Sequence, residues 1–153
     1  MRFRRYILSI LIPVLCFVAC EGNYYIENDL HGMWQVTSVE KKMTSDTTET
    51  YGLLYYSFQR NIAMLSYNHS NAPENMTRYI APFEYIGSDS IGVGTFKYYT
   101  TGEGDYVNQE FVVPLDSLLK FGISQSYTSF QVKLSKHKLT LTSDSACVTL
   151  CKY

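Results

Sequence analysis

The stretch "SFQVKLSKHKLTLTSDSACVTLCKY" (Ser129–Tyr153) decides the fold class, because apolar and polar side chains alternate in three successive runs. Side chains of a β-strand point alternately to the two faces of a sheet, so each run predicts a strand with one buried face. The connections "KHK" and "SDS" are short, which favours antiparallel neighbours. The side chains predicted to point inward are Phe130, Val132, Leu134, Leu139, Leu141, Ala146, Val148 and Leu150.

Further alternating runs occupy much of the chain from residue 33 to residue 115. Polar or glycine-containing segments separate them, among them 41–50, 68–77 and 100–105, which we expect to be loops. The count is eight or nine strands, and strands do not alternate with helices as a parallel sheet would require. An antiparallel meander of this size commonly closes into an up-and-down β-barrel. A two-sheet β-sandwich is the alternative.

One short helix is predicted before the last three strands. Pro114 and Asp116 are typical of a helix start, and Gly122 is typical of a helix end. The apolar stripe of this helix, two or three turns long, would consist of Leu115, Leu118 and Leu119.

Residues 1–19 have the order of a secretory signal peptide, with arginines first, an apolar run from Tyr6 to Val18 next, and the small residue Ala19 last. The apolar run is shorter than the roughly 20 residues that a membrane-spanning helix needs. We therefore expect a signal peptide over 1–19, a tether over 20–28 and one folded domain over 29–153. Loss of three arginines with the signal peptide would change the formal net charge from −1 to −4. An acidic domain argues against a nucleic-acid surface.

The residues "FVAC" (Phe17–Cys20) resemble the lipobox of bacterial lipoproteins, with Phe17 where that family usually has leucine. The resemblance implies cleavage before Cys20 and lipid attachment to its thiol. Several acyl chains would then hold the domain durably on a membrane. We expect an outer-membrane lipoprotein, and the sequence leaves open whether it faces the periplasm or the cell surface.

Two cysteines remain in the folded part. Cys147 and Cys151 lie four residues apart in a predicted strand, which separates their Cα atoms by roughly 13 Å. A disulfide needs Cα atoms within about 7 Å. We therefore predict two free thiols on the outward face of the last strand, with a disulfide to a partner chain as the alternative.

The stretch "LHGMWQV" (Leu30–Val36) is similar to the Gly-x-Trp signature that opens the first strand of lipocalins and their calycin relatives, with Gly32 and Trp34 at the matching positions. This resemblance implies an up-and-down barrel of about eight strands whose closed end is plugged by Trp34. It also implies a basic residue packed over the indole ring. The candidates are Lys152, at the end of the last strand, and Arg60.

The sequence contains no motif of a known enzyme class, such as G-x-S-x-G, H-E-x-x-H or a phosphate-binding loop. The three histidines are predicted in a strand-entry segment, a loop and a turn, where solvated side chains are usual. We therefore expect a protein that binds without catalysis and that needs no metal or cofactor.

Two functional hypotheses remain open. In the first, an aromatic-lined barrel cavity binds a small apolar or sugar-like ligand, with a lining of Tyr56, Phe58, Tyr79, Phe83 and Tyr85. The same tyrosines are also ordinary strand residues with amphipathic rings. In the second hypothesis the barrel is filled, and the loops 41–50 and 68–77 contact a protein partner.

Overall fold

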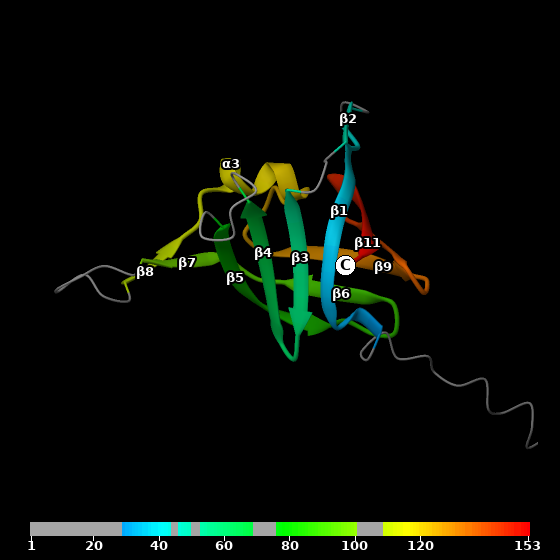
Figure 1. Ribbon diagram of the computed structural model, residues 1–153, viewed down its shortest axis with the longest axis horizontal. Helices are drawn as coiled ribbons and strands as arrows, with labels where there is room; N and C mark the ends of the chain where they lie inside the picture. Colours follow the sequence, from blue (N-terminus) through cyan, green and yellow to red (C-terminus); the bar gives the residue numbers. More distant parts are fainter. Residues whose placement is uncertain (1–28, 44–45, 50–52, 69–75, 101–108) are drawn as a thin grey trace, which may run out of the picture.

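The computed structural model describes residues 29–43, 46–49, 53–68, 76–100 and 109–153 (Figure 1). The predicted signal peptide, the tether and Cys20 lie outside the described residues. Among the described helices, none has the length and apolarity that a membrane crossing requires.

Eight antiparallel strands form a closed barrel. Around the ring the order of pairing is β4-β3-β1-β11-β10-β9-β6-β5, and pairing of β5 with β4 completes the circle. The barrel prediction is thereby confirmed, and the two-sheet alternative is wrong. The strands of the ring are β1 (Gly32–Lys41), β3 (Leu54–Gln59), β4 (Ile62–Asn68), β5 (Met76–Tyr85), β6 (Ser90–Val93), β9 (Thr128–Leu134), β10 (Lys138–Thr142) and β11 (Ala146–Lys152).

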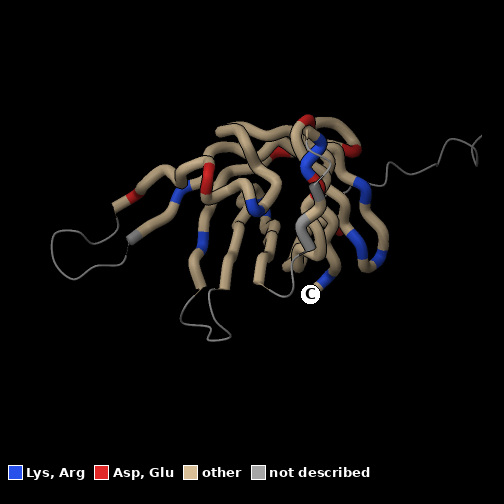
Figure 2. The backbone as a smooth tube through the Cα atoms, turned by 90° about the horizontal axis from the view of Figure 1, so that it is seen from above, with Lys and Arg blue, Asp and Glu red and all other residues tan. Residues whose placement is uncertain are grey.

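Three further described strands lie outside this ring. Strand β2 (Asp46–Glu49) pairs with the end of β1. Strand β7 (Lys97–Thr100) pairs with β5 where Lys97 faces Ile80, and β8 (Gln109–Val112) pairs with β7. The hairpin of β7 and β8 projects away from the barrel in both Figure 1 and Figure 2.

Two of the predicted loops are shorter than expected. Residues 46–49 form β2, which pairs with β1; its residues are all polar, so no apolar alternation could reveal a strand. In the segment 68–77, Asn68 ends β4 while Met76 and Thr77 begin β5. The remaining residues of both loops are only partly described.

The predicted helix exists, but only Leu118 of its predicted apolar stripe is buried. It consists of α3 (Leu115–Leu118) followed by a 3₁₀ turn, η2 (Leu119–Phe121), and it ends at Gly122 with φ 77°. A 3₁₀ turn has about three residues per turn, so positions three apart share a face. Leu118 and Phe121 share the buried face of this turn, and Leu119 lies on another face and is 40% exposed. Leu115, at the start of α3, is 41% exposed.

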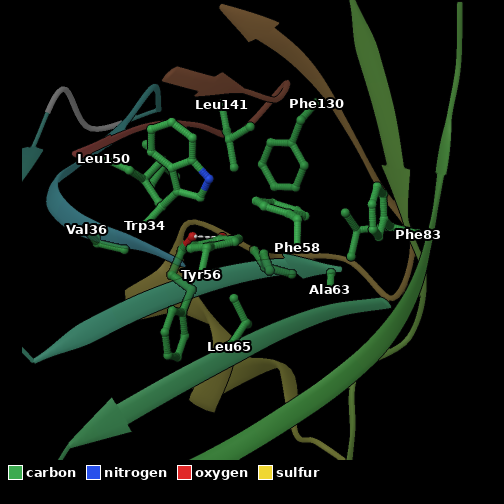
Figure 3. Packing of buried hydrophobic residues seen from close by; sticks show 14 of the residues in the cluster. Trp34, Val36, Tyr56, Phe58, Ala63, Leu65, Phe83, Phe130, Leu141 and Leu150 are labelled. Carbon is green, nitrogen blue, oxygen red and sulfur yellow. Dashed lines mark hydrogen bonds between the residues drawn. The ribbon is translucent and has the colours of Figure 1, made fainter. Parts of the chain in front are cut away.

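The barrel core follows the alternation of the C-terminal strands. All the side chains predicted to point inward from these strands are buried, except Leu134, which is partly buried against the core. Figure 3 shows the labelled side chains of β1, β3 and β4 converging with Phe130, Leu141 and Leu150 on the barrel interior. Cys147 and Cys151 point outward and are free thiols, as predicted.

Candidate functional site

The indole of Trp34 fills one end of the barrel. Its side chain is 1% exposed, and its Nε1 donates a hydrogen bond to the carbonyl of Leu30 at 2.8 Å. The ammonium of Lys152 lies 4.3 Å from the ring centroid and donates to the carbonyl of His31 at 2.6 Å. Arg60, the other basic candidate, lies in the turn between β3 and β4 with φ 55°. Lys152 is thus the residue that makes the cation–π contact.

Glycine is favoured at position 32 for two reasons. Its φ of 115° is a backbone conformation that residues with a Cβ rarely adopt. A Cβ at this position would also lie 2.9 Å from Lys152 Nζ. The glycine thus lets the lysine reach across to the tryptophan.

Three of the five predicted lining residues are fully inside the barrel core. Tyr56, Phe58 and Phe83 are 0%, 1% and 4% exposed. The ring centroid of Phe58 lies 5.9 Å from that of Tyr56 and 5.3 Å from that of Phe83. The hydroxyl of Tyr56 donates to the carbonyl of Phe121 at 2.6 Å, and burial raises the pKa of Tyr56. These side chains fill the barrel interior where a cavity was expected.

The other two predicted residues, Tyr79 and Tyr85, lie at the periphery of the same cluster. Both are partly buried, and Tyr85 packs on Phe83 with ring centroids 5.5 Å apart. Tyr79 instead contacts Phe121 and Tyr98, each at a centroid distance of 6.5 Å. Phe121, which the sequence analysis did not identify, joins Tyr79 to Tyr56 and so to the core.

The segment η2 covers the barrel end opposite to the start of β1 (Figure 1). Gly122 packs there so closely that a Cβ would lie 2.5 Å from Val148 Cγ2 and 3.3 Å from the Cβ of Ala146. This contact holds the preceding Lys120 and Phe121 at the barrel mouth. No pattern in the sequence around Lys120 pointed to this position.

We call the group formed by Tyr67, Tyr79, Tyr98, Lys120 and Phe121 the mouth cluster. The ammonium of Lys120 lies 3.5 Å from the centroid of Tyr67 and 5.6 Å from that of Phe121. All three tyrosines are partly buried against the core. The cluster therefore combines one cation with an aromatic surface that is not fully covered.

The charge of Lys120 is not neutralised within the described part of the chain. Burial lowers the pKa of this lysine, because removal from water disfavours the charged form. Among the described residues the single ion pair joins Lys97 to Glu110, on the hairpin of β7 and β8. The mouth cluster thus contains a partly buried ammonium that has no carboxylate partner among the described residues.

The projecting hairpin has a polar and an apolar face. On one face, Lys97 and Tyr99 both bind the carboxylate of Glu110, and these hydrogen bonds lower the pKa of Glu110. On the other face the rings of Tyr98 and Phe111 stack with centroids 5.4 Å apart. Phe111 is 40% exposed on this face, whereas Val112, opposite Lys97 on the polar face, is 61% exposed. The described residues contain no group of three metal-ligating side chains there or elsewhere.

Comparisons with known proteins agree with the barrel. Residues 15–153 match the family model described as a lipocalin-like domain. A search of curated proteins gives no match. A crystal structure of a lipocalin-like protein from Bacteroides uniformis is 16% identical, with a TM-score of 0.56, and covers 82% of this chain and 100% of its own. An uncharacterized protein from Bacteroides eggerthii is 14% identical, with a TM-score of 0.59 and the same coverage.

At these identities the two structures establish the fold alone. The family match covers most of the chain and agrees with the closed barrel. The chain belongs to the family of lipocalin-like domains.

Proposed function

We propose that this protein is a lipid-anchored binding protein of the outer membrane that holds a small apolar molecule with an anionic group at the mouth cluster, without catalysing a reaction. The observation that carries the proposal is the half-buried ammonium of Lys120, which lies over Tyr67 and has no carboxylate partner among the described residues. A lipocalin-like barrel is compatible with ligand binding in general.

The filled interior favours the barrel mouth over the barrel centre. Protein cores are close-packed, so a ligand could enter the space of Tyr56 and Phe58 only by displacing them. Tyr79 and Tyr98 are only partly buried, so their rings are accessible to an incoming apolar group. The apolar part of the ligand would therefore lie on these rings.

The charge of Lys120 favours an anionic ligand over a neutral one. A partly desolvated ammonium interacts more strongly with a carboxylate than an exposed one does, because screening by water is reduced. Hydrogen bonds between charged partners are also about twice as strong as neutral ones. A medium-chain carboxylate such as octanoate meets both requirements of the cluster.

Replacement of the lysine tests this assignment. Lys120→Met keeps the length and apolar character of the side chain, and it is expected to weaken octanoate binding about tenfold, the lower limit for a lost charged hydrogen bond. The measurement is calorimetric titration of the purified full-length protein, with the detergent background subtracted. The affinity for 1-octanol should stay within about twofold, because no charge is involved.

The matched control is Lys136→Met, in the exposed turn between β9 and β10, which should leave both affinities unchanged. Octanoate affinity of the unsubstituted protein should also fall as the pH rises through the pKa of Lys120, which lies below that of an ordinary lysine. Equal octanoate affinity for Lys120→Met and Lys136→Met would contradict the proposal.

Lipid attachment is tested separately. Cys20→Ser removes the thiol that would carry the acyl chains, and it is expected to move the protein from the membrane fraction to the soluble fraction. Fractionation followed by immunoblotting measures this shift. Two results together would refute the anchor. The Cys20→Ser variant would stay in the membrane fraction, and the mass of the unsubstituted protein would be that of the unmodified precursor.

One observation favours a second function, the binding of a protein partner. Phe111 and Val112 are exposed on β8, whose described pairing is to β7 alone. Exposed apolar side chains on an edge strand are a common feature of interaction surfaces. The hairpin would then act in place of the loops 41–50 and 68–77. Absence of binding for octanoate and 1-octanol alike would leave this function as the better candidate.

A further inference from the structure

We propose a second binding site, for a small neutral saccharide, in a cleft on the outer wall of the barrel. The cleft has a volume of about 500 Å³ and lies where the segment before β9 faces the turn between β10 and β11. Sites for small molecules commonly have volumes of about 300–1,000 Å³. We call it the rim cleft, and it shares no residue with the mouth cluster.

The rim cleft is lined almost entirely by hydroxyl and amide side chains. Ser129 and Gln131 point outward from β9, and Gln125 precedes that strand. All three are exposed, and within the described chain their side chains make no hydrogen bond. Amides and hydroxyls both donate and accept hydrogen bonds, as sugar hydroxyls do. The lining therefore matches a polyhydroxylated ligand better than an apolar one.

The charges of the rim cleft favour a neutral ligand. One ammonium, on Lys42, and one carboxylate, on Asp144, lie in its lining. Lys42 is already engaged, because its Nζ donates to the carbonyl of Ser143. Opposite charges in the same cleft cancel at longer range, so neither an anion nor a cation is preferred as a whole.

A hydrogen-bonded group of serines holds one wall of the cleft in place. Ser124 Oγ donates to Ser145 Oγ at 2.9 Å, and Ser145 Oγ lies 3.3 Å from Ser143 Oγ. Ser143 Oγ accepts a hydrogen bond from the backbone N–H of Ala146 at 3.1 Å. The residue Ser143 is buried, with 6% of its surface exposed. This wall is formed before a ligand arrives, which lowers the entropic cost of binding.

An aromatic ring is fixed at the edge of the cleft. Tyr127 packs over Gly92, where a Cβ would lie 2.0 Å from the tyrosine Oη, and its hydroxyl donates to Glu84 at 3.2 Å. The side chain is nevertheless 49% exposed. A ring that is both fixed and exposed offers an apolar surface for the C–H face of a sugar, beside the polar groups that bind its hydroxyls.

The experiment is an NMR titration of the full-length protein with glucose, galactose and N-acetylglucosamine, and with glucuronate as a charged counterpart. The expected result is a set of shifts in the backbone amides of Gln125, Ser129 and Gln131 with at least one neutral sugar. Tyr127→Ala should weaken that affinity about tenfold, and Gln131→Ala about two- to tenfold, the range for one lost hydrogen bond. Lys133→Ala, on the same strand but outside the cleft, should leave the affinity unchanged.

Tyr127→Phe separates the ring from its hydroxyl, and it should retain most of the affinity because the ring surface remains. If no neutral sugar shifts the rim-cleft amides up to its solubility limit, or if Tyr127→Ala and Lys133→Ala bind equally, the inference is overturned. Stronger binding of glucuronate than of glucose would overturn the neutral class. Because the two sites share no residue, Lys120→Met should leave saccharide binding intact, and Tyr127→Ala should leave octanoate binding intact.

Discussion

Trp34→Ala is expected to lower the free energy of unfolding by about 3–5 kcal/mol, the range for removal of a large aromatic side chain from a core. The indole is 1% exposed and closes the barrel end beside Leu30. Its loss leaves a cavity, an unpaired carbonyl on Leu30 and an ammonium on Lys152 without its ring. Urea unfolding followed by circular dichroism measures the change.

Lys152→Met is the companion substitution, because it removes the cation and keeps the tryptophan. It should cost about 0.5–2 kcal/mol, since a partly exposed cation–π contact is worth less than the indole itself. Its hydrogen bond to the carbonyl of His31 is lost as well.

A loss of unfolding free energy below about 1 kcal/mol for Trp34→Ala, far under the range for core aromatic side chains, would show that the tryptophan does not stabilise the barrel end.

Gly122→Ala is expected to lower the free energy of unfolding by about 2–6 kcal/mol, the sum of two causes. A residue with a Cβ at φ 77° is strained by about 1–3 kcal/mol. The new methyl group would also lie 2.5 Å from Val148 Cγ2, inside the barrel core, and overpacking typically costs about 1–3 kcal/mol. Relief of the clash would move η2, so octanoate binding at Lys120 should weaken too.

Gly87→Ala is the matched control, because it isolates the backbone strain. Gly87 has nearly the same φ, 78°, but nothing lies within 4 Å of its Cβ position. Its loss of stability should therefore be clearly smaller than that of Gly122→Ala, with octanoate binding unchanged. Equal losses for the two variants would mean that the packing of Gly122 on Val148 does not hold the mouth.

The strands of the barrel could be predicted from sequence where one face is buried. Alternation along the last three strands is regular because each inward residue meets the core, and Trp34 and Val36 begin β1 in the same way. Strand β2 carries no such signal, since Asp46–Glu49 pairs with β1 at the rim. The helix stripe was wrong at Leu119 because a change from α to 3₁₀ geometry after Leu118 cannot be seen in a periodic pattern.

The candidate sites were harder to predict than the fold. The alternation of side chains along β3 predicted that Tyr56 and Phe58 point inward. It could not show that Phe121 packs against Tyr56 from η2. The ammonium of Lys120 lies over the ring of Tyr67, which is far away in the sequence, so no local motif could predict this contact. The rim cleft draws polar residues from separate segments, each of which reads as an ordinary solvated surface.

Under the proposed function, an amphipathic anion binds at the mouth cluster and leaves the barrel core packed. An NMR titration of the full-length protein with octanoate tests both parts, because backbone amide shifts are measured residue by residue. The largest shifts are expected at Tyr67, Tyr98 and Lys120, with Phe58 and Phe83 unchanged. Shifts centred on Phe58 and Phe83, or no shift at Lys120, would contradict the proposed function.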